Sequence, residues 1–212
     1  MKNDTPRGSA VVKVLQTNSS IELGKEYVEL GIDALLESGA LKDIPLVNTV
    51  VGIFNIGNSV RDQMLASKLL RFIHQLSEVP HKDRLSMVEK LNDNERFSGR
   101  VGAVIIEILD RMESDKKPEL AAKCFAAYAR DELSFEEFRR ILLALERIPS
   151  FDIEKLEPFS RASTSDCQTM DEALLLSFVN AGLAQNNGGF DGGIIVPTKL
   201  CKKIVETGIV AV

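Results

Sequence analysis

Residues 44–60 read IPLVNTVVGIFNIGNSV and contain no ionisable side chain. The stretch lies at the lower edge of what a helix needs to cross a bilayer core of about 30 Å, and it contains three asparagines. We therefore expect a helix that its neighbours bury inside a bundle. The alternative is a helix that is released from the bundle and docks on a membrane or a partner. The contacting side chains would then be Val47, Val51, Phe54 and Val60.

Helical periodicity continues on both sides of this stretch. The second of the expected helices carries Val60, Leu65 and Phe72 on its inward side. Ser134 and Glu137 fit a capping box, in which a hydroxyl and a carboxylate satisfy free N–H groups at the start of a helix. The expected helices span about 20–38, 43–78, 80–91, 97–112, 118–128 and 134–148.

The pattern changes at Pro149. Residues 149–169 hold two prolines and the polar run SRASTSDCQT, which indicate a linker with one short helical turn. A helix at about 170–181, a glycine-rich hairpin and a last helix opened by Thr198 follow. We therefore expect a mainly α protein with a multi-helix bundle and a small C-terminal α+β unit. Its parts are a poorly ordered or extended lead-in at 1–19, the bundle at 20–148, the linker at 149–169 and the α+β unit at 170–212.

The composition is that of an ordinary globular protein, with 44% hydrophobic and 27% charged residues and a net charge of −5. Net acidity argues against a general nucleic-acid binder, which carries a basic surface. Cys124, Cys167 and Cys201 are far apart and form no CxxC pair, which favours buried thiols in a reducing compartment. The first 20 residues lack the apolar segment of a signal peptide. We expect a cytoplasmic protein, with peripheral membrane attachment as the alternative.

The sequence contains no recognisable catalytic or cofactor-binding motif. The phosphate-loop pattern GxxxxGK[ST], the nucleophile-elbow pattern GxSxG and the zinc pattern HExxH are absent. His74 and Glu78 are four residues apart and share one face of an expected helix, but a metal site needs at least three ligands. We expect no enzymatic activity, no metal and no cofactor, and a histidine–carboxylate site at these two residues ranks last.

The C-terminal segment resembles the second half of a winged helix domain. Gly182 and Leu183 end a helix, Ile194 to Val196 form one arm of a hairpin, and Thr198 opens a helix. The resemblance implies a DNA-associated regulator. However, the helix at 170–181 has no basic residue to present to bases or phosphates. The only local basic cluster is Lys199, Lys202 and Lys203.

Residues 41–148 also resemble bacterial helical proteins of the TerB-like kind. The likeness rests on the helical pattern, which includes LKDIPLVNTVVGIFNIGNSVRDQMLASKLLRFI, and on the acidic capping segment DELSFEEF. It implies a bacterial stress-response or phage-defence setting and implies no mechanism.

These observations favour a non-catalytic scaffold or effector. We expect it to bind a protein partner, or a second copy of itself, or a membrane surface through the helix at 44–60. The alternative is a DNA-associated regulator that uses the C-terminal unit, although net acidity makes nucleic acid an unexpected partner.

Overall fold

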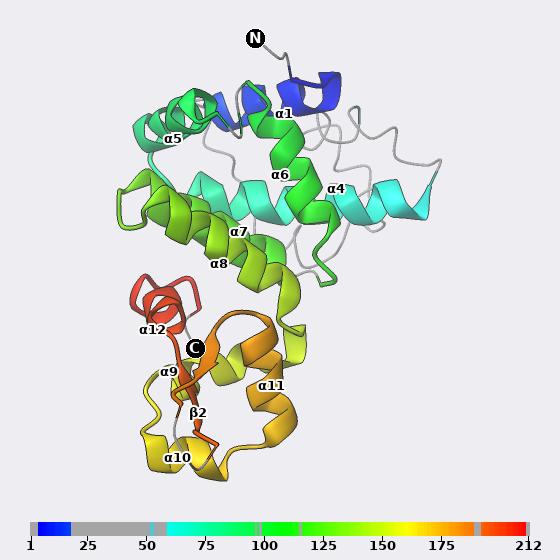
Figure 1. The fold of residues 1–212 in the computed structure, drawn as a ribbon. Coiled ribbons are helices and arrows are strands. Elements are labelled where there is room, and N and C mark those ends of the chain that lie inside the picture. The colour runs from blue at the N-terminus through cyan, green and yellow to red at the C-terminus, as the bar shows by residue number, and fades with distance from the viewer. Residues whose placement is uncertain are drawn as a thin grey trace. The chain divides into compact units, whose positions relative to one another are not determined.

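The computed structural model describes residues 4–17, 52, 59–95, 97, 99–114, 116–188 and 192–210. Within this part of the chain the protein is mainly α-helical, and its only sheet is one antiparallel pair of strands (Figure 1). The chain divides into two compact units, and the boundary lies between Ala129 and Arg130. The predicted helix at 20–38 lies outside the described residues, as does the stretch 44–58 apart from Gly52.

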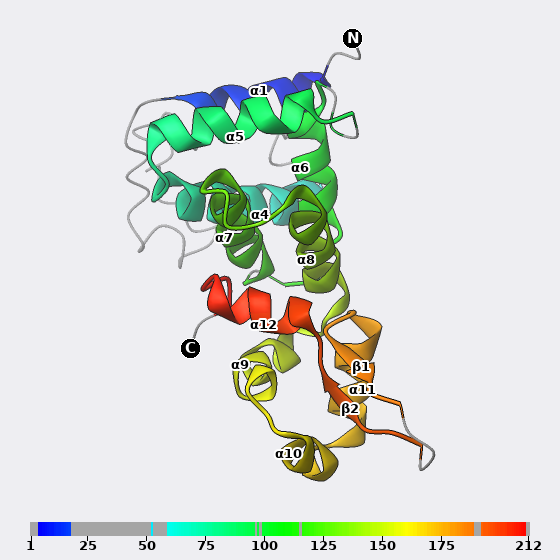
Figure 2. The same ribbon diagram turned by 60° about the vertical axis from the view of Figure 1, so that its left-hand side comes forward.

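The first unit is a bundle in which α4 packs mainly on α7, and α1 packs on α6 and α5. Figure 2 shows α1 and α5 side by side. Phe72 of α4 meets Phe125 of α7 edge to face, with ring centroids 5.2 Å apart. The described helices of this unit are α1 (Pro6–Gln16), α4 (Val60–Ser77), α5 (His81–Asp93), α6 (Val101–Asp110) and α7 (Lys117–Ala129).

Helix α4 is shorter than the predicted helix at 43–78. The backbone of Ser59 is extended, with φ −155° and ψ 133°, so the helix begins at Val60. Leu65 and Phe72 are buried as predicted, but Val60 is 72% exposed, so its predicted inward position was wrong. The helical period explains this error, because a residue five positions before Leu65 lies about 140° away from it around the helix.

Within the lead-in predicted at 1–19, Pro6–Gln16 form helix α1, so the prediction of a poorly ordered or extended segment was wrong for these residues. The hydroxyl of Thr5 accepts a hydrogen bond from the Gly8 N–H at 3.0 Å, and Pro6 occupies the first helical position. The buried side chains of α1 are Val11, Val14 and Leu15. Their spacing forms one apolar stripe, so packing on the bundle stabilises a helix that is too short to persist alone.

The backbones of α1 and α6 touch where two glycines face each other. A methyl group added to Gly102 would overlap the carbonyl group of Gly8. Just before α1, the carboxylate of Asp4 accepts hydrogen bonds from the Gly102 and Ala103 N–H groups, at 2.9 and 3.0 Å. Asp4 therefore caps the start of a helix that lies almost 100 residues further along the chain.

The C-terminal end of α1 is held by two side chains of α5. The buried Arg84 guanidinium donates to the Thr17 carbonyl at 2.9 Å and to the Ser77 carbonyl at 3.4 Å. His81 Nε2 donates to the Gln16 carbonyl at 2.8 Å. Hydrogen bonds at both ends therefore hold α1 in place in the first unit.

The second unit begins earlier than predicted, at Arg130, and includes α8, against which α12 packs. The capping box at Ser134 and Glu137 is confirmed by reciprocal hydrogen bonds of 2.8 and 3.2 Å. The elements of this unit are α8 (Phe135–Arg147), the 3-10 helix η2 (Ser150–Lys155), α9 (Leu156–Ser160), α10 (Thr164–Thr169), α11 (Glu172–Asn180), β1 (Ala184–Asn186), β2 (Ile195–Pro197) and α12 (Lys199–Glu206).

The segment predicted as a linker at 149–169 is a folded part of this unit, so that prediction was wrong. It contains η2, α9 and α10, and it buries Ile153, Leu156, Phe159 and Cys167. Phe159 stacks on Phe178 of α11 with ring centroids 4.7 Å apart. The polar run hides a second capping box, in which Ser163 and Asp166 satisfy each other's backbone N–H groups at the start of α10.

The predicted hairpin and last helix are confirmed. Gln185 pairs with Val196 in an antiparallel register. Gly182 ends α11 with a positive φ of 75°, and the Leu183 N–H then bonds back to the Phe178 carbonyl at 2.8 Å. The hydroxyl of Thr198 accepts from the Cys201 N–H at 3.2 Å and so caps α12.

Replacing Asp4 by alanine tests the cap on α6. We expect Asp4→Ala to lower the free energy of unfolding by about 1 kcal/mol, because two N–H groups at the start of α6 lose their acceptor. Urea denaturation followed by circular dichroism measures the change. Asp93→Ala, which removes an exposed carboxylate at the end of α5, is the matched control and should leave stability unchanged or slightly raised. Equal losses in the two variants would contradict the capping role.

Candidate functional site

Most residues of the predicted membrane or partner helix cannot be placed. Val47, Val51 and Phe54 lie outside the described residues. Val60 lies at the start of α4, one helical turn from the exposed Met64. In the part of the chain that the structure describes, none of the helices combines the length and the apolar character that crossing a bilayer requires.

The predicted basic cluster presents two exposed lysines rather than three. Lys199 and Lys202 are exposed on α12, whereas Lys203 is half-buried. Hydrogen bonds from Ser134 lower the pKa of Glu137, and the positive charge of Lys203 lowers it further. Arg130 lowers the pKa of Glu132, again with a contribution from Lys203. Since Lys203 acts on two carboxylates of its own unit, the cluster falls short of a basic footprint for nucleic acid.

The histidine–carboxylate candidate is not assembled as a site. Glu78 accepts a hydrogen bond from the Gln75 side chain at 2.5 Å, and none of the bonds among the described residues joins it to His74. His74 keeps its Nδ1 buried without a hydrogen-bond partner. No group of three histidine, cysteine, aspartate or glutamate side chains within the described ranges is arranged to hold a metal ion.

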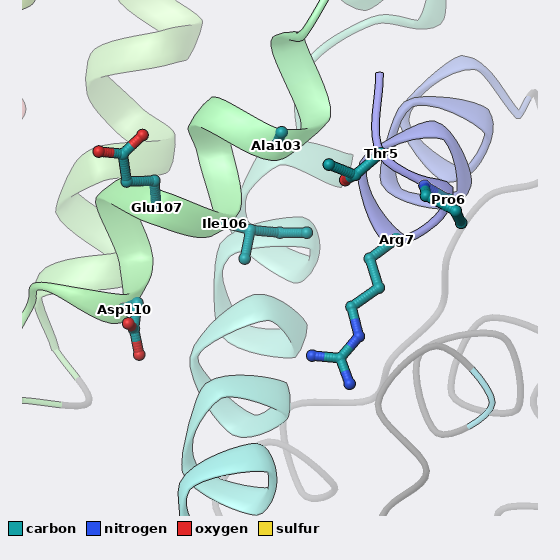
Figure 3. Close-up of a pocket in the computed structure, with 7 residues that line it drawn as sticks. All are labelled: Thr5, Pro6, Arg7, Ala103, Ile106, Glu107 and Asp110. Atoms are coloured by element: carbon teal, nitrogen blue, oxygen red, sulfur yellow. The ribbon is translucent and has the colours of Figure 1, made fainter. Parts of the chain in front are cut away.

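A groove of about 630 Å³ lies between the start of α1 and the side of α6 (Figure 3). Ile106 points across it toward Arg7, while the carboxylates of Glu107 and Asp110 turn away. Asp110 accepts hydrogen bonds from Arg61 at 2.5 and 3.4 Å, Arg7 pairs with Asp62 at 3.4 Å, and Glu107 pairs with Arg111. The charged groups of this groove are therefore engaged in surface ion pairs, which hold helices in register weakly and offer no acid–base pair.

The three cysteines are free and buried. Burial raises the pKa of Cys201 to about 12 and the pKa of Cys124 well above its usual value. Burial and the charge of Asp166 raise the pKa of Cys167. Because the thiolate is the nucleophile, these environments suppress thiol chemistry at neutral pH.

The clearest exposed apolar surface in the second unit lies on α11. Leu176 is 52% exposed and Val179 is 39% exposed, while Leu175 and Phe178 face the core. We define the α11 face as the exposed side chains on this side of the helix, none of which is basic. They are Glu172, Ala173, Leu176, Val179 and Asn180.

A side-chain hydrogen bond links α11 to the neighbouring 3-10 helix. The hydroxyl of Ser177 donates to the buried carboxylate of Asp152 at 2.9 Å, and Lys155 pairs with the same carboxylate at 3.3 Å. Phe151, next to Asp152 in η2, is 78% exposed. The Asp152–Ser177 hydrogen bond therefore joins η2 to α11. The exposed apolar side chains Phe151 and Leu176 are the chain neighbours of these two residues. Contiguous exposed apolar side chains mark interaction surfaces, and Leu176 and Val179 are neighbours of this kind, one turn apart on α11.

The α11 face was missed from the sequence, although a signal was present. Leu174, Leu175 and Leu176 follow one another, so apolar side chains point in three directions around a short helix. A surface helix needs only one apolar stripe to pack on its core. The excess of leucine could therefore have indicated a second, outward apolar surface.

Alkylation tests the environments of the thiols. We expect iodoacetamide at about pH 8 to leave Cys124 and Cys201 of the native protein unmodified, because raised pKa values and burial keep both thiols protonated and covered. Intact mass should show three modified thiols after unfolding in guanidinium chloride. Rapid modification of Cys124 or Cys201 in the folded protein would contradict the burial described here.

Comparisons with known proteins do not assign a family or a function to this structure. None of the family models, curated proteins or solved structures compared with the chain matches it. The function is therefore inferred from the exposed and buried side chains of the chain itself.

Proposed function

We propose that this protein is a non-catalytic scaffold or effector that acts by binding protein through the α11 face. The observation that carries the proposal is the exposure of Leu176 and Val179 on a helix whose opposite side is packed into the core of its unit. Covering a leucine side chain of this exposure removes apolar surface from water and favours association by about 1 kcal/mol.

The charges on this helix favour protein over nucleic acid. Asp171 and Glu172 lie at the start of α11, and the described helix carries no lysine or arginine. If the C-terminal unit is a winged helix, as its resemblance implies, α11 stands just before the hairpin and would need basic side chains to contact DNA phosphates, which it lacks. An acidic start and an apolar middle suit a protein surface better.

Two other functions remain predictions. The winged-helix resemblance and the exposed Lys199 and Lys202 favour a DNA-associated regulator. Membrane-surface association depends on Val47, Val51 and Phe54, which lie outside the described residues. A bacterial stress-response or phage-defence role rests on the TerB-like resemblance alone.

Site-specific photo-cross-linking in cells tests the docking role of the α11 face. With a photoreactive side chain at position 173, we expect cross-links to protein, and the change Leu176→Asp should reduce them roughly tenfold or more. The reason is that a carboxylate buried against an apolar surface costs more than the 1.4 kcal/mol that a tenfold change represents. Leu143→Asp is the matched control, because Leu143 is an exposed leucine on α8 of the same unit.

Circular dichroism must show that both aspartate variants keep the native helix content. Cross-links that are insensitive to Leu176→Asp, or equally sensitive to Leu143→Asp, would contradict docking through the α11 face. Binding of the purified protein to labelled duplex DNA at low salt, where even weak phosphate contacts are detected, would favour the DNA-associated alternative.

A further inference from the structure

The C-terminal hairpin contains an Asn–Gly step, Asn187–Gly188, which is the only one in the sequence. Both residues are exposed. In such a step the backbone nitrogen of the glycine can attack the side-chain amide of the asparagine, because the glycine has no Cβ to hinder the approach. Gly188 also has a positive φ of 75°, a conformation that favours glycine. The chain therefore places its least hindered residue type directly after an exposed amide group.

The side chain of Asn187 takes the place of its own main-chain carbonyl in the pairing of β1 with β2. The register joins Asn186 to Ile195, so the next opposed residues are Asn187 and Ile194. The Asn187 N–H donates to the Ile194 carbonyl at 2.9 Å, as in any antiparallel ladder. The Ile194 N–H, however, donates to Asn187 Oδ1 at 2.8 Å. A side-chain oxygen thus accepts the hydrogen bond that a main-chain carbonyl accepts in a regular antiparallel pair.

The side chain of Asn186 holds the nitrogen that would attack. Its Oδ1 accepts from the Gly188 N–H at 2.8 Å, and its Nδ2 donates to the Gly192 carbonyl at 2.9 Å. A methyl group added to Gly193 would overlap Asn186 Oδ1, so glycine is required where the chain passes this side chain. The Gly188 nitrogen must lose its proton before it attacks, and the hydrogen bond to Asn186 is lost with that proton. Asn186 therefore restrains the reaction that Gly188 permits.

We propose that Asn187 is a site of spontaneous deamidation, which converts it to aspartate or isoaspartate. Hydroxide from the solvent removes the proton of the Gly188 N–H, the nitrogen bonds to Asn187 Cγ, and the bond between Cγ and Nδ2 breaks. The leaving nitrogen takes a proton from water and departs as ammonia, which leaves a cyclic imide and restores the hydroxide. Water then opens the imide at either of its carbonyl carbons. Water is the only co-reactant, and no oxidation or reduction takes place.

Ile194 supports the first step of this reaction. Negative charge develops on Asn187 Oδ1 as the nitrogen bonds to Cγ, and the Ile194 N–H already donates to this oxygen. A backbone N–H in such a position stabilises developing negative charge, as the donors of an oxyanion hole do. The hairpin thus activates the side-chain carbonyl of Asn187, while Asn186 restrains the nucleophile.

The hairpin keeps its pairing after the reaction, because the acceptor of the Ile194 N–H survives in both products. In isoaspartate the main chain runs through Cβ and Cγ, so the former Asn187 Oδ1 becomes a main-chain carbonyl oxygen in the ladder. In aspartate the same oxygen belongs to a carboxylate, which also accepts hydrogen bonds. Either product adds a negative charge to a chain whose net charge is −5. Deamidation therefore changes the charge of the hairpin and leaves β1 paired with β2.

Ageing the full-length chain in mildly alkaline buffer, followed by peptide mass spectrometry, tests the site. We expect deamidation of Asn187 to be roughly tenfold faster than that of Asn180, an exposed asparagine of the same unit that is followed by alanine. Electron-transfer fragmentation should identify isoaspartate among the products at position 187. Equal rates at Asn187 and Asn180 would overturn the proposal.

Variants of Asn186 test its restraint on Gly188. We expect Asn186→Ala to speed deamidation of Asn187 roughly fivefold, because the Gly188 N–H loses its acceptor. Asn186→Asp keeps an acceptor and should react no faster than the original chain. Gln185→Ala, at the preceding position of β1, is the matched control and should also keep the original rate.

Hydrogen exchange separates the restraint from a loss of pairing. The Asn187 N–H, which donates to Ile194, should stay protected in Asn186→Ala. If that variant unpairs the hairpin, Asn186→Asp decides, and a rate above that of the original chain contradicts the restraint. Asn186→Ala with a paired hairpin and the original rate would contradict it as well.

The aged chain tests whether the pairing is retained. The Ile194 amide should exchange as slowly in the deamidated chain as in the original one, because its acceptor oxygen is still present. Exchange of this amide at the rate of an unfolded peptide would show that deamidation releases β1 from β2, contrary to the proposal.

Discussion

Helix α1 lies against α6 with backbone touching backbone, and this contact requires glycine at two positions far apart in the sequence. Gly8 and Gly102 leave no room for a side chain between them. The close approach brings Asp4 within hydrogen-bond distance of the first N–H groups of α6. It also lets α1 cover α5, where Arg84 and His81 hold its C-terminal end. Val11, Val14 and Leu15 of α1 are therefore part of the core of the first unit.

The second unit is organised differently, around short elements that one aromatic pair and several caps hold together. Phe159 and Phe178 stack in its core, while capping boxes begin α8 and α10. Because α11 uses Leu175 and Phe178 to pack, Leu176 and Val179 point outward. The exposed apolar surface thus follows from a helix whose composition supplies more apolar side chains than one packed face can use.

Local signals in the sequence predicted a large share of this fold, and the errors have both local and long-range causes. The capping box at Ser134, the hairpin and the cap at Thr198 were predictable because each depends on residues close together in the chain. Helix α1 was missed because its stability depends on Gly102, whose proximity no local pattern reveals. Residues 149–169 were misread because their polar composition hides a capping box and short helical pieces.

The candidate site was harder to predict than the fold. Lys199, Lys202 and Lys203 are adjacent on α12, but only the structure shows that Lys203 acts on two nearby glutamates. The α11 face depends on which of three consecutive leucines is buried in the core. The orientation of α11 is set by the contact of Phe178 with Phe159 and by the Asp152–Ser177 bond, whose partners lie on other elements. Periodicity alone cannot predict this orientation. It gives the angles between side chains around the helix but does not show which side of the helix packs on the core.

The effect of Gly102→Ala on the stability of α6 tests the contact between α1 and α6 most directly, because two physical effects predict opposite signs. Helix propensity alone would raise the stability of α6 by about 1 kcal/mol. We expect instead a loss of about 1–3 kcal/mol, with faster amide hydrogen exchange in both α1 and α6, because the added methyl group overlaps the backbone of Gly8. Slower exchange in α6 with α1 unchanged would show that the two backbones do not touch.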